Sequence, residues 1–117
     1  MAQQKIEIDM SEAQGYRILK PTGDLDVYTV GSLRDALGTM VEDEAPRVVV
    51  DLDSVPFMDS SGLGALMGGV RRLREAGGDL AIACTREQHL KLFTITGFGE
   101  GVSIAPTIEE AAQGFRG

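Results

Sequence analysis

Two aspartates follow a run of valines, which gives the pattern of an apolar strand followed by Asp51, Leu52 and Asp53. Phosphatases with an aspartate nucleophile use this spacing, because one carboxylate attacks phosphorus and the second handles the leaving-group proton. That chemistry also needs a lysine and further acidic metal ligands from a much larger domain. The short remainder of the chain contains no second acidic pair after a predicted strand. We therefore interpret Asp51 and Asp53 as solvated aspartates at the end of a buried strand.

The other residue types with catalytic potential are isolated in the sequence. His89 is the only histidine, and it falls within a predicted helix, where we expect it to be exposed and too distant from a serine for a catalytic triad. Cys84 is the only cysteine, and its apolar neighbours favour a small core residue over a nucleophile or metal ligand. No Gly-x-x-x-x-Gly-Lys phosphate loop occurs. The residue types therefore predict no enzyme, no metal site and no bound cofactor.

Two hydroxyls remain, those of Ser60 and Ser61, at the predicted start of a glycine-rich helix. Each glycine inside a helix costs about 1 kcal/mol relative to alanine, so the glycines of this helix require a reason. Gly64 and Gly68 lie four residues apart on one face, and we expect them to pack closely against a neighbouring element. Gly62 lies in the first turn, where we expect it to keep the space before the helix open for another molecule.

Ser60, Ser61 or the preceding Asp59 could each be the N-cap of this helix. An N-cap role explains one serine hydroxyl and leaves the other one spare. A phosphate placed on a serine here would meet free helix N–H groups and the positive end of the helix dipole. The spacing thus predicts a modifiable serine without choosing between Ser60 and Ser61.

Charge narrows the partners that such a site could have. The 117 residues carry a formal net charge of -7, and the pI is near 4.6, which disfavours binding to nucleic acid or to an anionic membrane. No apolar run approaches the roughly 20 residues that span a bilayer, and residues 1–5 contain no signal-like apolar stretch. With a single cysteine and no disulfide framework, the sequence predicts a protein of the reducing cytoplasm.

Hydropathy periods predict the elements that position the two serines. Alternation at 5–10 and the strand pattern at 16–20 predict an antiparallel hairpin. Buried strands are predicted at 48–52 and 79–84, and a short last strand at 101–105. Helical spacing begins near residue 29 and again at residue 60, the second helix running to about 76 with Leu63, Met67, Val70 and Leu73 on its apolar side. Capping-box patterns open two further helices at 85–88 and 107–110.

The predicted order is β-β-α-β-α-β-α-β-α, which is an α/β fold with helices packed on a mixed sheet. We expect a single domain over residues 1–117, with its core at about 5–115. The segment from Asp24 to Asp26 follows a Pro-Thr-Gly break and is expected in an exposed loop or short extension.

Residues 48–52, leading into residues 57–64, resemble the hallmark segment of anti-sigma factor antagonists, which are small STAS-domain proteins of bacteria. Similar motifs stand at 23–26, before the first helix, and at 92–98, in the third helix and its exit. The resemblance extends from about residue 5 to residue 115, with the motifs in the expected order. It implies a STAS-like fold for the single domain.

The resemblance also implies a partner-switching mechanism. In its unmodified form such a protein binds an anti-sigma factor, which is also a serine kinase, and thereby frees the sigma factor. The kinase uses ATP to phosphorylate the serine directly after the aspartate, which ends the interaction, and a metal-dependent serine phosphatase restores it. The protein itself is expected to carry no cofactor.

Carried over residue by residue, the resemblance assigns the phosphorylation to Ser60, with Asp26 and Asp59 flanking it. Asp24 stands where the family more often has glutamate. The partner-binding residues that we expect are Asp24, Asp26, Asp59, Ser61, Gly62 and Gly64. The same acidic residues would surround a phosphate on Ser60, so a docked partner would meet both bulk and uncompensated negative charge.

We weigh three hypotheses of function. The first is a phosphorylatable anti-sigma factor antagonist that acts by protein binding. The second is a STAS subunit of a larger assembly, such as a lipid-transport complex or a stress-signalling scaffold, in which Ser60 is structural. The third is an Asp51-dependent phosphatase. The intact acceptor serine and the lack of further predicted domains favour the first hypothesis.

Overall fold

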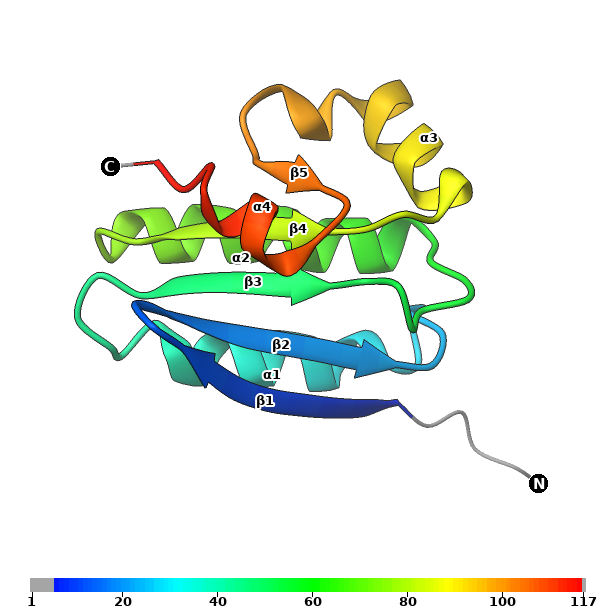
Figure 1. Cartoon of the computed structure of the whole chain (residues 1–117). Coiled ribbons are helices and arrows are strands. Elements are labelled where there is room, and N and C mark those ends of the chain that lie inside the picture. The colour runs from blue at the N-terminus through cyan, green and yellow to red at the C-terminus, as the bar shows by residue number, and fades with distance from the viewer. Residues whose placement is uncertain (1–5, 117) are drawn as a thin grey trace.

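Five strands form a single mixed sheet in the computed structural model, which describes residues 6–116 (Figure 1). The strands lie in the order of the chain, β1-β2-β3-β4-β5, with β1 antiparallel to β2 and the other neighbours parallel. Their bounds are β1 Glu7–Ala13, β2 Tyr16–Thr22, β3 Arg47–Asp51, β4 Asp79–Ala83 and β5 Ile104–Ala105. The predicted α/β class, element order and mixed sheet are confirmed.

The first hairpin is longer than its alternation predicts. The start of the predicted first strand at residue 5 lies outside the described residues, whereas its end extends to Ala13, and the tight turn is made at Gly15, whose φ is +91°. β2 continues through Pro21, which is paired with Ile8 of β1. Proline is tolerated there because β3 pairs only with residues 17–19 of β2. Pro21 therefore has no neighbouring strand on the β3 side to which a backbone N–H would have to donate.

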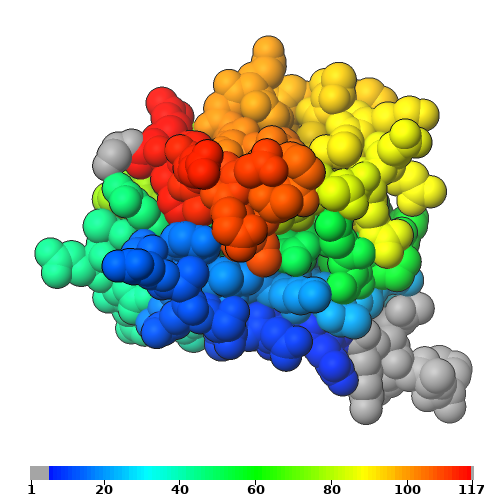
Figure 2. Space-filling view, viewed as in Figure 1, coloured from blue at the N-terminus to red at the C-terminus, as the bar shows by residue number. Residues whose placement is uncertain are grey.

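Helices cover both faces of the sheet (Figure 1). α1 (Val30–Met40) and α2 (Ser60–Glu75) lie side by side on one face, and the short α4 (Ile108–Ala112) lies on the other. α3 (Glu87–Thr96) and the 3-10 helix η1 (Phe98–Glu100) sit beyond β4, at the β5 edge. Figure 2 shows α4, in orange-red, covering the middle of its face.

The apolar run of β3 divides between the two layers, as expected for a strand that is covered on both faces. Val48 and Val50 join the large core under α1 and α2, whereas Val49 packs with the alanines of β4 and with Ala111 of α4. The inward residues of the two long helices are Leu33, Leu37 and Met40 in α1 and Leu63, Leu66, Val70 and Leu73 in α2. α2 is thus held to the sheet along its length.

Two local expectations, at Met67 and at the start of α3, are wrong. Met67 of α2 is exposed, and Leu66 takes its place in the core, because the buried stripe runs through 63, 66, 70 and 73 rather than through 67. α3 has no side-chain cap, since Thr85 is engaged with Asp53 instead of closing a capping box. At α4 the N-cap half of the predicted capping box does form, with Thr107 Oγ1 accepting a hydrogen bond from Glu110 N at 3.1 Å.

None of the helices within residues 6–116 is both long and apolar enough to pass through a membrane.

Candidate phosphorylation and docking site

The segments that leave β2 and β3 are joined to each other by backbone hydrogen bonds. Leu25 N donates to Phe57 O at 2.9 Å, Asp59 N donates to Leu25 O at 3.1 Å, and Leu25 forms a parallel bridge with Met58. Leu25 is completely buried, so the expectation of an exposed loop at 24–26 is wrong for its central residue. The pairing brings Asp24 and Asp26 to the end of the sheet from which α2 begins, at the carboxyl ends of the parallel strands.

Figure 2 shows the same arrangement on the surface. Green atoms of the segment after β3 lie between the light-blue atoms of the segment after β2 and the yellow atoms of α3.

Asp59, rather than either serine, is the N-cap of α2. Its backbone is extended, and its Oδ1 accepts hydrogen bonds from Ser61 N at 2.8 Å and Gly62 N at 3.3 Å. Ser60 is exposed and Ser61 is half-buried. Neither hydroxyl has a hydrogen-bond partner among the residues that the structure describes. Both hydroxyls are therefore spare, whereas a serine N-cap would have left only one of them spare.

The capping by Asp59 changes what a phosphate at this site would meet. The N–H groups in the first turn of a helix have no partner within the helix. In α2, those of Ser61 and Gly62 are already bound to the Asp59 carboxylate. The expectation that free helix N–H groups would hold the phosphate is thus wrong for these two. A phosphate on Ser60 would instead stand beside a carboxylate, which opposes the favourable effect of the helix dipole.

Asp26 organises the turn that leads into α1, whose N-cap is Thr29. Its Oδ1 accepts hydrogen bonds from Tyr28 N at 2.9 Å and Thr29 N at 3.2 Å, and its carbonyl accepts one from Val30 N at 2.9 Å. Thr29 Oγ1 donates to Asp24 O at 2.6 Å. The flanking residues expected from the sequence therefore lie together at the site, and Asp26 and Asp59 also build the two helix starts.

The glycines of α2 have roles opposite to those expected. A Cβ on Gly62 would lie 2.6 Å from Met58 Cγ and 3.2 Å from Leu25 O, so this buried glycine permits the close approach of the two joined segments. A Cβ on Gly64 or Gly68 would meet no atom within 4 Å. Close packing thus explains Gly62, whereas the open space lies over Gly64, two residues further along.

The residues suspected of other chemistry hold the loop before α2. Asp53 Oδ1 accepts hydrogen bonds from Thr85 N at 2.6 Å and Thr85 Oγ1 at 3.1 Å, and Asp51 Oδ1 accepts one from Asp53 N at 3.0 Å. The expectation that these aspartates are simply solvated is therefore incomplete. The Asp53 carboxylate fastens the loop to Thr85, just before α3, and the Asp51 carboxylate holds the backbone of Asp53.

His89 is buried, and its Nε2 lies 2.6 Å from Val55 O, so the expectation of an exposed histidine is wrong. The sequence held a signal for this, because His89 lies one helical turn before the buried Phe93 and shares its face.

Cys84 is a buried core residue, as predicted. Burial raises the pKa of its thiol, and the nearby carboxylates of Asp53 and Asp51 raise it further. The thiol is therefore protonated at neutral pH and a poor nucleophile. Within residues 6–116, no group of three or more histidine, cysteine or acidic side chains is placed to hold a metal ion.

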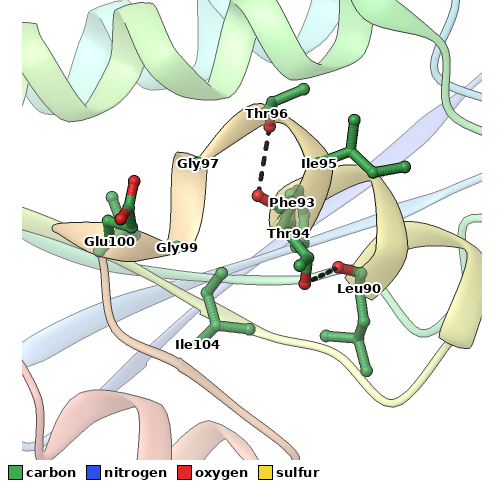
Figure 3. Close-up of a pocket in the computed structure, with 10 residues that line it drawn as sticks. Leu90, Phe93, Thr94, Ile95, Thr96, Gly97, Gly99, Glu100 and Ile104 are labelled. Carbon is green, nitrogen blue, oxygen red and sulfur yellow. Dashed lines mark hydrogen bonds between the residues drawn. The ribbon is translucent and has the colours of Figure 1, made fainter.

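A groove of about 770 Å³ lies between α3, η1 and β5 (Figure 3). Its apolar wall includes Leu90, Ile95 and Ile104, while Thr94 Oγ1 and Thr96 Oγ1 donate hydrogen bonds to carbonyls of their own helix. Glu100 is the ionisable side chain among its lining residues. None of these residues belongs to the segments that carry Ser60, so the groove is separate from the candidate site.

Sequence reasoning missed a set of exposed apolar side chains on the two segments that are joined at Leu25. Tyr28 is 82% exposed, Val27 is 65% exposed and Phe57 is 52% exposed. Hydropathy could not identify these exposed residues, because it does not distinguish an exposed apolar residue from a buried one nearby in the sequence. The bridge at Leu25 and Met58 decides which neighbours point outward.

The contrast between Gly62 and Gly64 gives a test of the site's construction. We expect Gly64→Ala to raise the free energy of unfolding by up to about 1 kcal/mol, because alanine has the better helix propensity and meets open space. Gly62→Ala should lower it by about 1 kcal/mol or more, because its methyl group overlaps Met58 and Leu25. Denaturant unfolding of both variants measures the two changes, and changes of the same sign would contradict this packing.

Comparison with known proteins agrees with the fold and with the sequence resemblance. The STAS domain family matches residues 7–111. The anti-sigma-B factor antagonist of Staphylococcus aureus is 34% identical over 92 residues, which cover 79% of this chain and 85% of that protein. The crystal structure of an anti-sigma factor antagonist from Mycobacterium paratuberculosis superposes with a TM-score of 0.83 at 25% identity and covers 92% of each chain.

A second solved structure is the Bacillus cell fate determinant SpoIIAA in the phosphorylated form. It superposes with a TM-score of 0.70 at 25% identity, over 92% of this chain and 97% of that one. Given the match to the family over nearly all of the described residues, this chain belongs to the STAS-domain family and is a relative of the bacterial anti-sigma factor antagonists.

Proposed function

We propose that this protein is an anti-sigma factor antagonist whose partner binding is switched off by phosphorylation of Ser60. The observation that carries the proposal is the state of Ser60 itself. It is exposed, it opens α2 directly after the Asp59 cap, and its hydroxyl is engaged with no other described residue. In the unmodified form the protein binds an anti-sigma factor and so releases the sigma factor.

The names of relatives support the partner. The Staphylococcus aureus relative is named for antagonism of an anti-sigma factor, and the structure of SpoIIAA in a phosphorylated form gives a precedent for modification in a similar fold. The anti-sigma factor is proposed to be the serine kinase that consumes ATP, and a metal-dependent serine phosphatase is proposed to reverse the step. The protein itself acts in the cytoplasm by binding, without catalysis, cofactor, nucleic acid or membrane.

The effect of the phosphate follows from the charges around Ser60. Phosphorylation adds about -1.5 to -2 charges at neutral pH. The new group stands beside the Asp59 carboxylate, on a surface that also carries Asp24 and Asp26. A partner docked there would bury negative charge without a compensating cation, and a cost of several kcal/mol is enough to reverse a micromolar association.

The other hypotheses have less support from the site. A purely structural Ser60 would use its hydroxyl in hydrogen bonds within the fold, and none exists with the described residues. An Asp51-dependent phosphatase would need a carboxylate open to substrate, whereas Asp51 Oδ1 is bound to Asp53 N.

The first expected result concerns the acceptor. Incubation with the cognate kinase and ATP should add one phosphate, on Ser60, because its hydroxyl is the exposed one. Peptide mass spectrometry locates the phosphate, and Ser61→Ala is the matched control, which should be modified like the natural protein. Modification that persists in Ser60→Ala would contradict the assignment.

The second expected result concerns the switch. Ser60→Ala should bind the anti-sigma factor like the unmodified protein and remain active in the presence of the kinase. Ser60→Asp should bind at least about tenfold more weakly, because its carboxylate adds an unpaired charge to the interface. Isothermal calorimetry compares the two affinities. If they are equal, charge at residue 60 does not control binding.

A further inference from the structure

Several aromatic and aliphatic side chains near the starts of α1 and α2 are not buried by the fold. Val27 and Tyr28 follow Asp26, and Phe57 precedes the buried Met58. Met67 lies about two helical turns beyond Ser60 on α2, and it is exposed as well. We call these four residues, Val27, Tyr28, Phe57 and Met67, the exposed apolar set. Apart from them, the large apolar side chains that are exposed within residues 6–116 are Met10 and Ile95.

The backbone at Tyr28 and Phe57, two members of the exposed apolar set, is fixed by hydrogen bonds. Tyr28 N donates to Asp26 Oδ1 at 2.9 Å, and Phe57 O accepts a hydrogen bond from Leu25 N at 2.9 Å. The two aromatic residues therefore belong to one bonded unit centred on the buried Leu25. Aromatic side chains on a rigid backbone lose little conformational freedom when a partner covers them, which favours them as binding anchors.

Gly64 is the second feature that the fold itself does not explain. It is exposed in the first half of α2, and a Cβ there would meet nothing within 4 Å. A glycine at this point weakens the helix without improving any internal contact. It lies between Ser60 and Met67 on the exposed side of α2, where the absence of a side chain lets another molecule approach the helix backbone.

Carboxylates determine the kind of partner that fits. Asp24, Asp26 and Asp59 are half-buried near the start of α2. The chain as a whole carries a formal net charge of -7. A second copy of this chain would place the same carboxylates opposite each other in a two-fold interface. An anionic membrane would be repelled in the same way. The complementary surface is an apolar recess bordered by lysine or arginine.

Resting on the proposed function, we infer that Tyr28 and Phe57 are the principal anchors for the unphosphorylated state, and that the anti-sigma factor receives them in an apolar recess with a basic border. The basic border would pair with the existing carboxylates of Asp24, Asp26 and Asp59. A phosphate on Ser60 would add a further negative charge to the docked surface, where the partner excludes water and its cations are already paired. This arrangement makes binding depend on the anchors and makes release depend on Ser60.

Two variants and a matched control test the inference. Tyr28→Ser and Phe57→Ser remove the proposed anchors, and Ile95→Ser removes an apolar side chain that is also 82% exposed but belongs to the groove at α3. Calorimetry with the purified anti-sigma kinase that phosphorylates Ser60 should show Kd raised at least tenfold for each anchor variant and changed less than twofold for Ile95→Ser. Phosphorylation kinetics should show a raised KM and a nearly unchanged kcat for the anchor variants.

The possible outcomes separate the inference from the proposed function. If the natural protein binds the kinase and the anchor variants match Ile95→Ser, the inference is wrong and the proposed function stands. If the natural protein does not bind at all, both fail. Sedimentation that shows self-association lost in Tyr28→Ser, or binding to phosphatidylglycerol vesicles lost in Phe57→Ser, would overturn the inference in favour of a second copy or a membrane.

Discussion

The backbone pairing of Leu25 with residues 57–59 is the constraint on which the rest of the site depends. It joins two segments that leave neighbouring parallel strands, and it places the starts of α1 and α2 at the same end of the sheet. Because Leu25 and Met58 are buried by the pairing, the residues beside them are turned outward. Gly62 allows the two segments to approach this closely, since any side chain there would strike Met58 and Leu25.

Each of the two helix starts is closed by an aspartate with a second role. Asp59 caps α2 and Asp26 organises the start of α1, so both carboxylates are held by backbone N–H groups. The same carboxylates place negative charge around Ser60. Variants of Asp59 will therefore change stability and partner binding together, because loss of an N-cap costs about 1 kcal/mol. Variants of Asp26 will do the same, because its carboxylate holds the turn before α1. Ser60, which the fold does not use, is the residue at which charge can change with the least structural consequence.

Hydropathy periods predicted the strands, the helices and the two-sided burial of β3, because these depend on which residues share a face. The hydropathy periods did not predict which residues of other segments pack against each position. Gly62 and Gly64 were assigned the wrong way round for this reason, since packing at Gly62 comes from a loop that is distant in sequence. His89 was misplaced because its partner, Val55 O, lies on another segment. Ser60 was chosen over Ser61 by the family resemblance, and its exposure agrees with that choice.

The central claim is that a charge on Ser60 acts at the surface and leaves the fold intact. The helix dipole favours a phosphate there by about 0.3–1 kcal/mol, and repulsion from Asp24, Asp26 and Asp59 opposes it by a comparable amount that salt screens. Amide hydrogen exchange of the unmodified and Ser60-phosphorylated protein tests the claim most directly. We expect equal protection through α2, melting temperatures within a few degrees and much weaker partner binding. Loss of protection spreading along α2 from Ser60 would show instead that the switch is conformational.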